Sequence, residues 1–113
     1  MSRAQALADL LAKVEAGDDI TAHHTSRIFN PGYAHAINAA SGSLDAALAL
    51  HNAVLPMWEA RVKVGADGNP SRAFLTSLTP VSGKPSSVVA WGIIPARVWL
   101  CAILTALIEG ATE

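Results

Sequence analysis

Hydrophobic residues are most concentrated in a C-terminal run from Pro95 to Gly110, which reads PARVWLCAILTALIEG. Pro95 fixes the backbone angle that a first helical residue requires, and its missing N–H would have no helical partner there. Almost no polar face remains in the run, so a helix here must be covered on several sides. Gly110 predicts the end of this helix, because glycine adopts left-handed geometry without steric cost. We therefore expect the central helix of the core, with its main contacts at Leu100, Ile103, Leu104 and Leu107.

The spacing of apolar residues near the N-terminus predicts an amphipathic helix. These residues recur at the i, i+3, i+4 and i+7 positions that share one helix face: Leu7, Leu10, Leu11 and Val14. Ser2 and Gln5 form a capping-box pattern, in which each side chain bonds to a backbone N–H that the helix start leaves unpaired. Gly17 then predicts the end of the helix.

Two further helices are predicted in the middle of the chain. Residues 30–32 read Asn-Pro-Gly and have the composition of a turn, and residues 33–40 follow as a short helix, YAHAINAA. A longer helix is expected from Ser43, whose hydroxyl can cap it, to Leu55, after which Pro56 ends it. Its core face is predicted to carry Leu44, Ala47, Leu48, Leu50, Val54 and Leu55.

Residues 57–64 change from the helical period to strict alternation, which is typical of a strand with one face in solvent. The side chains expected to face the core are Trp58, Ala60, Val62 and Val64. Those expected to face outward are Glu59, Arg61 and Lys63. A one-residue error in this register would exchange the two faces, so burial along the strand tests it directly.

A returning strand is expected over residues 71–79, after a turn-rich segment at 65–70, although Phe74, Leu75 and Leu78 do not alternate cleanly. Residues 87–91 favour a third, shorter strand. The order of helices, hairpin and helix predicts an α+β fold. Its small antiparallel sheet would pack against the N-terminal helices and the buried C-terminal helix.

The C-terminal half also contains a largely apolar stretch, residues 88–108, close to the ~20 residues that a membrane span needs. Gly92, Pro95 and Arg97 interrupt it, and a central arginine costs about 2.5–3.5 kcal/mol on insertion scales. We therefore expect a strand followed by a buried helix, and no membrane partner. The N-terminal residues include acidic groups where a secretory signal needs an unbroken apolar core. With Cys101 as the only cysteine, the sequence favours a reducing cytoplasm.

The composition favours self-association of one small domain spanning residues 1–113. Hydrophobic residues make up 51% of the chain and charged residues 15%. A small domain has much surface for its volume, so this apolar content is difficult to bury in a monomer. We expect a homodimer. The formal net charge of −1 indicates no basic surface for nucleic acid, so a nucleic-acid partner is not expected.

The histidines invite a metal or ligand interpretation, since His23, His24 and His35 lie close together in the chain. Metal-binding histidines on one helix face need i, i+3 or i+4 spacing, whereas adjacent histidines point apart. We therefore expect no metal and no cofactor. If the protein binds a small ligand between subunits, the obvious groups to hold it are His23, His24, Arg27 and Tyr33.

No pattern in the sequence predicts catalytic residues. Cys101 lies within an apolar helix, where a thiol has a raised pKa and little access, so core packing is the favoured interpretation. Asp18 and Asp19 with Glu15 are expected to be a solvated helix end. The sequence has no glycine-rich phosphate loop, no G-x-S-x-G and no C-x-x-C. An enzyme is therefore the minority interpretation.

The large aromatic side chains are interpreted mainly as core residues: Trp58, Trp99, Tyr33 and Phe74. Trp91 is the expected exception, because it lies beside Gly92 just before the last helix and tryptophans are enriched in binding hot spots. Arg61 is expected to be a solvated or ion-paired surface residue. We assign Trp91 and Arg61 to a candidate interface.

From Ser43 onward the chain resembles the phage ABA sandwich domain family. The resemblance joins SLDAALAL, LPMWEARVKVG, FLTSLTP and IIPARVWLCAILTAL, and covers about residues 43–109. It departs from the family in residues 18–42, where this chain carries HHTSRIFNPGYAH instead of a short acidic-apolar helix. The resemblance implies a phage or prophage origin and a helix–sheet–helix layering. It implies no catalytic residues.

Three functions follow from these observations, in order of preference. The first is a non-catalytic phage or prophage accessory protein that binds a host or phage protein. The second is a protein that sequesters a nucleotide-type ligand against host defence. The third is a minor hydrolase. Soaking with a panel of nucleotides separates the first two, and detectable turnover is required to keep the third.

Overall fold

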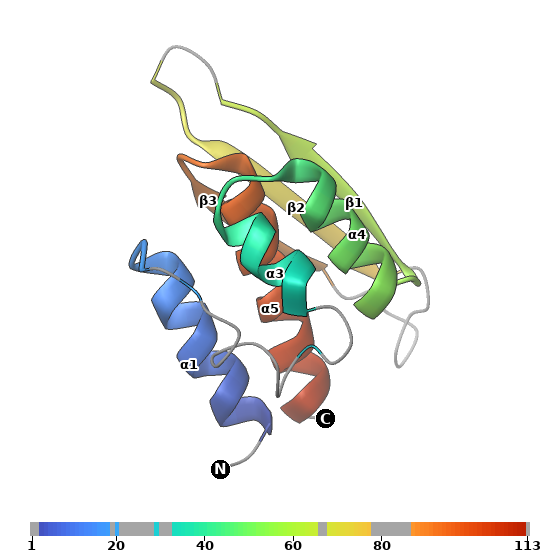
Figure 1. The fold of residues 1–113 in the computed structure, drawn as a ribbon. Coiled ribbons are helices and arrows are strands. Elements are labelled where there is room, and N and C mark those ends of the chain that lie inside the picture. The colour runs from blue at the N-terminus through green and yellow to red at the C-terminus, as the bar shows by residue number, and fades with distance from the viewer. Residues whose placement is uncertain are drawn as a thin grey trace.

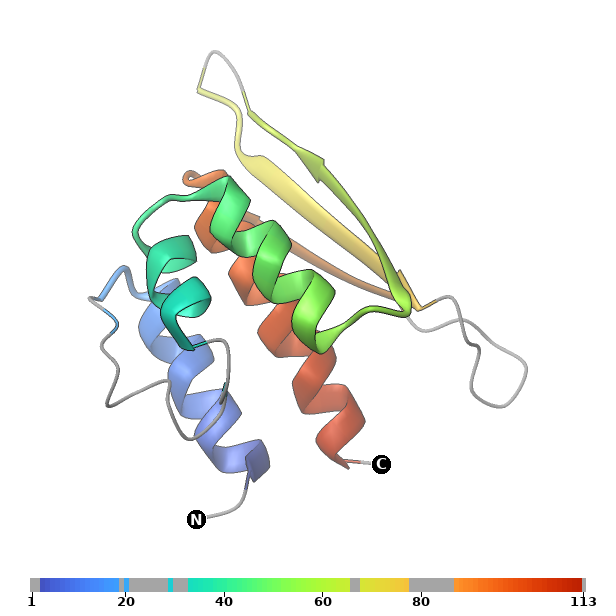
Figure 2. The ribbon, with the colours of Figure 1, turned by 45° about the vertical axis from the view of Figure 1, so that its right-hand side comes forward.

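The chain forms a three-stranded antiparallel sheet with all of its described helices on one side (Figure 1). The computed structural model describes residues 3–18, 20, 29, 33–65, 68–77 and 87–112, with only the backbone at 3, 4, 33 and 110–112. The elements, in chain order, are α1 (Arg3–Glu15), α3 (Tyr33–Ala40), α4 (Leu44–Val54), β1 (Trp58–Lys63), β2 (Ser71–Ser77), β3 (Ser87–Gly92) and α5 (Pro95–Thr112). Figure 2 shows the helical layer beside the sheet. This arrangement confirms the predicted α+β fold.

Helix α5 lies at the centre of the core. It packs against α1, α3 and α4 on its helical sides and against β2 and β3 on its sheet side. Leu100, Ile103 and Leu104 are fully buried, and Leu107 is half-buried. The prediction of a central helix is confirmed. The predicted end at Gly110 is wrong, because α5 continues through this residue to Thr112. A helical glycine costs only about 1 kcal/mol relative to alanine, which is not enough by itself to end a helix.

The apolar stretch over residues 88–108 divides as predicted into a strand and a helix, β3 and α5, with Gly92 and Pro95 at the boundary. Arg97, in the first turn of α5, bonds to backbone carbonyls of other elements. Among the described ranges, no helix combines the length and the apolar character that crossing a membrane requires.

Helix α1 buries the predicted stripe and ends at the predicted glycine. Leu7, Leu10 and Val14 are buried, while Leu11 is half-buried. Gly17 has φ +81, and the amides of residues 17 and 18 donate to the carbonyls of residues 14 and 13. This is the pair of hydrogen bonds of a Schellman motif, which needs a left-handed residue at C′. The proposed capping partner Ser2 lies outside the described residues.

Helix α4 begins as predicted but turns a different face to the core. The Ser43 hydroxyl accepts a hydrogen bond from the Ala46 amide at 3.1 Å, which confirms the predicted cap. The buried residues of the helix are Ala46, Ala47, Leu50 and His51. Leu44 and Leu48 are 40% and 47% exposed, so their assignment to the core face is wrong. They lie about 100° of helical rotation or more from the centre of the buried stripe.

The sheet follows the predicted register, with one correction at its end. Along β1, burial alternates from Trp58 to Lys63, and the apolar side chains face the helices. Val64 is 57% exposed because β1 ends before it, so its assignment to the core is wrong. In β2 two neighbouring apolar residues lie on opposite faces of the sheet: Leu75 is buried and Phe74 lies on the outer face. The third strand, β3, is confirmed; residues 78 and 79 of the predicted returning strand lie outside the described residues.

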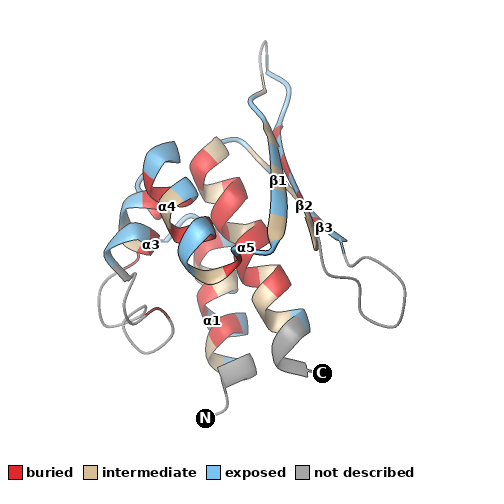
Figure 3. Cartoon of the chain, turned by 90° about the vertical axis from the view of Figure 1, so that its right-hand side faces the viewer, coloured by how far each residue is buried: buried red, intermediate tan, exposed pale blue. Residues whose placement is uncertain are grey.

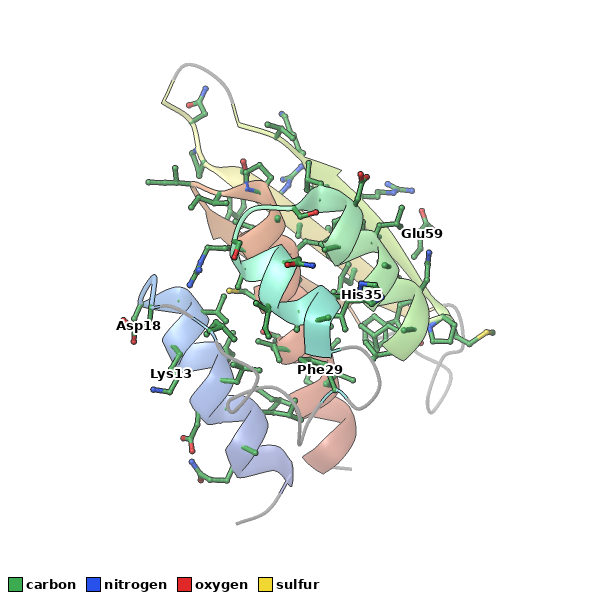
Figure 4. All side chains as sticks on the ribbon, in the orientation of Figure 1. Lys13, Asp18, Phe29, His35 and Glu59 are labelled. Carbon is green, nitrogen blue, oxygen red and sulfur yellow. The ribbon has the colours of Figure 1, made fainter. Side chains whose placement is uncertain are left out.

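The segment before α3 is described only at Ile20 and Phe29, which are both buried. Helix α3 confirms the predicted short helix, and it ends in a second Schellman pair around Gly42, which has φ +111. The predicted turn at residues 30–32 lies outside the described residues. His35 of α3 is exposed (Figure 4).

Candidate functional site

The outer face of the sheet is open, because the described helices cover only the inner face (Figure 3). Pairing between the strands aligns the outward side chains in rows. One row runs Lys63, Arg72, Trp91, and the next runs Arg61, Phe74, Val89. Three large apolar side chains are exposed there: Phe74 by 38%, Val89 by 48% and Trp91 by 60%.

Cations and aromatic rings are neighbours on this face. They form a group of five residues that we call the outer-face cluster: Arg61, Lys63, Arg72, Phe74 and Trp91. The Arg72 guanidinium carbon lies 5.3 Å from the centroid of the Trp91 ring, which is a cation–π contact. Arg61 Nε donates to Glu59 Oε1 at 3.2 Å in an exposed ion pair. A shallow hollow of about 340 Å³ opens among Arg61, Lys63, Arg72 and Phe74.

The two edges of the sheet differ in charge. Strand β1, at one edge, carries Glu59, Arg61 and Lys63. Strand β3, at the other edge, reads SVVAWG and has neither a charged residue nor a proline. Natural proteins use charges and prolines at edge strands to prevent pairing with other chains. The β1 edge is protected in this way and the β3 edge is not.

A cleft of about 700 Å³ lies beside the unprotected β3 edge. One wall comes from α1 at Leu11, Val14 and Glu15, the other comes from β3, and α5 contributes Arg97 and Cys101. Just beyond β3, Ile93 is 90% exposed and Ile94 is 47% exposed, and both also line the cleft. An apolar surface therefore continues from the strand edge into the cleft.

Arg97 holds the ends of two helices together at this cleft. Its guanidinium donates to the Ala40 carbonyl at 2.7 Å and to the Val14 carbonyl at 2.8 Å, in the last turns of α3 and α1. It also donates to the Asp18 carbonyl at 3.1 Å. The last carbonyls of a helix lack helical partners and carry partial negative charge, so a cation there is favourable. Arg97 is thus a structural residue of the cleft wall.

Cys101 is poorly suited to act as a nucleophile. Burial raises the pKa of its thiol to about 11, and the nearby Glu15 carboxylate raises it further, while Arg97 lowers it. The thiolate is the reactive form, so the thiol is protonated and unreactive at neutral pH. This confirms the raised pKa expected from the apolar helix.

The buried histidine among the described residues is His51, which the sequence patterns did not single out. It is 4% exposed, and its Nε2 lies 2.8 Å from the Trp58 carbonyl oxygen. Trp99 Nε1 donates to His51 Nδ1 at 3.4 Å, which fixes the tautomer: Nδ1 accepts and Nε2–H donates. His51 therefore joins α4, β1 and α5 as a satisfied core residue.

The predicted ligand-binding residues do not form a described site. His23, His24 and Arg27 lie outside the described residues. Tyr33 is the first residue of α3, and its side chain is not described. Within the described ranges, no three residues among His, Cys, Asp and Glu are placed to hold a metal ion.

The predicted interface residues, Trp91 and Arg61, both lie on the outer face, on strands that flank β2. Their role in an interface stays a prediction. The sequence analysis did not connect them with Lys63, Arg72 or Phe74, and it assigned Phe74 to the core. The alternation of β1 was sufficient to place Lys63 on the outer face. Arg72 and Phe74 could be placed there only from the pairing register of β2.

Comparison with protein-family models, with curated proteins and with solved structures found no match to this chain. The resemblance to the phage ABA sandwich family therefore stays a prediction.

Proposed function

We propose that this chain is a non-catalytic binding protein that works as a homodimer, in which two β3 edges pair antiparallel. The observation that supports this most strongly is the uncharged, proline-free edge of β3, which continues into the exposed Ile93 and Ile94. Such an edge presents about three unpaired N–H groups and three carbonyls to another strand, since alternate residues bond to opposite sides. Pairing satisfies these groups and covers the apolar side chains.

A second copy of the chain suits this edge because β3 is complementary to itself. Pairing about a two-fold axis at Ala90 places Val89 of each copy opposite Trp91 of the other copy. Both of these pairs lie on the outer face. Aromatic and β-branched residues opposite one another stabilise antiparallel pairs by about 0.2–1 kcal/mol each. No charge of β3 opposes a like charge across the axis. The protected β1 edge offers no comparable surface.

The cleft adds a second reason for an added strand. Helix α1 packs against α5, and the space between α1 and β3 is the cleft of about 700 Å³. A strand added beside β3 would lie over this cleft and bring Val88 and Ala90 of the second copy toward Leu11. The partly buried Leu11 would then lose its remaining contact with water, and removing apolar surface from water stabilises the pair.

Replacing Val89 with lysine tests this proposal. Lysine at an edge strand opposes pairing with another chain, so Val89→Lys should give a folded monomer. The matched control is Val64→Lys, which makes the same change at an exposed valine beyond the end of β1 and should leave a dimer. Sedimentation equilibrium gives the mass of each protein. A wild-type monomer, or a Val89→Lys dimer, would contradict the proposal.

The biological setting enters this proposal from the sequence resemblance alone. A phage or prophage origin, a host cell as the site of action and binding to a host or phage protein all rest on it. The nucleotide-sequestering alternative stays a prediction, because the side chains that would carry it are not described. A hydrolase that uses Cys101 as its nucleophile is not favoured, since burial raises the pKa of this thiol to about 11.

A further inference from the structure

We propose that the outer-face cluster binds single-stranded nucleic acid, with phosphates on its cations and bases stacked on its aromatic rings. The inference concerns the open face rather than the β3 edge and goes beyond the proposed dimer. Three cations and two exposed aromatic side chains lie on neighbouring strands of one uncovered face. Single-stranded nucleic acids are bound by this combination of positive charge and stacking platforms.

The positions of these cations on the outer face destabilise the sheet. Lys63 lies directly opposite Arg72 in the β1–β2 pair, and Arg61 lies two residues from Lys63 on the same face. Like charges directly opposite each other destabilise a sheet. Within the described part of the chain, the single carboxylate on this face is Glu59, which pairs with Arg61. The other two cations have no carboxylate beside them there, and a phosphate chain supplies the missing negative charge.

Charge is distributed unevenly over the molecule, although its total is close to zero. The helical side carries most of the described carboxylates: Asp9, Glu15, Asp18, Asp45 and Glu109. Figure 4 shows Asp18 near the end of α1, on the flank of the molecule opposite Glu59 of β1. The expectation of no nucleic-acid partner was drawn from the net charge of −1, which averages over these two sides. The local charge of the outer face is positive.

The aromatic rings favour nucleic acid over an acidic protein. Phe74 lies in the middle strand between Arg61 and Val89, and it is partly exposed without a described element above it. The Arg72 guanidinium carbon lies over the Trp91 ring, 5.3 Å from its centroid, so a guanidinium plane and an aromatic ring lie together on this face. Bases stack on aromatic rings and on guanidinium planes. An acidic peptide would use the cations but would leave these planes without a matching partner.

The open shape of the face favours a chain over a single nucleotide or a duplex. Small-ligand sites are concave and bury most of the ligand. The hollow of about 340 Å³ here is shallow and opens on the outer face of the sheet. A single strand can lie across the face and contact several residues, with its bases unpaired and available for stacking. A duplex would offer phosphates but would keep its bases stacked on one another.

Fluorescence anisotropy with a labelled mixed-sequence 12-nucleotide single strand tests the inference. Three phosphate contacts predict a slope of about −2 for log affinity against log salt, since each contributes about −0.7, so affinity should fall roughly twenty-fold from about 50 to 200 mM salt. Absence of binding at low salt would overturn the inference. Equal affinity for a mononucleotide, a duplex or a polyglutamate peptide would also overturn it.

Two lysine variants separate this site from general charge effects. Lys63→Gln should weaken binding and bring the salt slope closer to zero by about 0.7. The same change should leave the melting temperature unchanged or raise it, because it removes the like-charge opposition to Arg72. The matched control is Lys13→Gln, which removes the same charge from α1 (Figure 4) and should alter neither affinity nor slope. An equal effect of the two variants would refute the assignment.

Phe74→Leu tests stacking separately from charge. Leucine keeps an apolar side chain on the outer face but has no ring, so binding should weaken roughly tenfold with the salt slope unchanged. Circular dichroism confirms that the variant is folded. Unchanged affinity in a folded Phe74→Leu protein would show that bases do not stack there, and would overturn the inference.

Discussion

Removing the Arg97 guanidinium should destabilise the protein more than removing any surface charge. The guanidinium bonds to carbonyls at the C-terminal ends of α1 and α3 and fixes both to the start of α5. Arg97→Met keeps much of the aliphatic length and removes the donors and the charge. The carbonyls of Val14 and Ala40 then lose a charged partner at a partly buried site.

The expected loss follows from the two partly buried hydrogen bonds. A hydrogen bond to a charged group contributes about 1.5–3 kcal/mol. Some water can reach these carbonyls in the variant, so we expect a total loss of about 2–4 kcal/mol. The third bond, to Asp18, is exposed and adds little. For a domain of this size the melting temperature should fall by roughly 8–16 °C, at about 4 °C per kcal/mol.

Thermal and urea denaturation of three variants test the predicted loss of stability. Arg97→Lys keeps the charge but cannot bond to two separated carbonyls in the same planar geometry, so its stability should lie between those of wild type and Arg97→Met. Arg61→Met is the control, since the Arg61 side chain is 77% exposed in its ion pair and such pairs contribute less than about 1 kcal/mol. The reasoning is refuted if Arg97→Met melts within about 2 °C of wild type.

Two further predictions concern α5. Leu104→Ala should cost about 2–5 kcal/mol, because a fully buried side chain leaves a cavity, while Leu48→Ala on the exposed side of α4 should cost far less; equal denaturation midpoints for the two variants would argue against the central-helix assignment. The Cys101 thiol should also react slowly with iodoacetamide at pH 8 in the folded protein. Because folding raises its pKa from 9.0 to about 11, its contribution to stability should be complete below pH 9 and lost as the pH rises toward 11. Comparison with Cys101→Ser across this range measures the loss, and identical pH profiles would contradict it.

The sequence predicted those elements whose burial repeats along the chain. The stripe of α1, the Ser43 cap and the alternation of β1 are local patterns, so short stretches were sufficient to find them. The fold class followed from the order of these elements. Gly110 misled because glycine permits a helix end without requiring one, and α5 continues past it.

Features that depend on distant partners were not predictable in the same way. Arg97 bonds to carbonyls that are 57 and 83 residues away in the chain, and any residue type supplies a carbonyl. Phe74 and Leu75 are both apolar neighbours, and only the pairing of β2 with β1 and β3 determines which one faces outward. The burial of Leu44 and Leu48 depends on how α4 is rotated about its axis against α5. In the observed rotation, Ala46 and Ala47 face the core instead.

Disulfide trapping of the β3 pair tests the central claim most directly. In the proposed register Ala90 faces its own copy across the two-fold axis, with Cα atoms about 4.5–5.5 Å apart. This separation lies within the range that a disulfide spans, about 4.4–6.8 Å. Ala90→Cys in a Cys101→Ser background should therefore form a covalent dimer on mild oxidation at low protein concentration. Val64→Cys in the same background should remain monomeric on a non-reducing gel. A monomeric Ala90→Cys protein, or equal cross-linking of the two variants, would contradict pairing through β3.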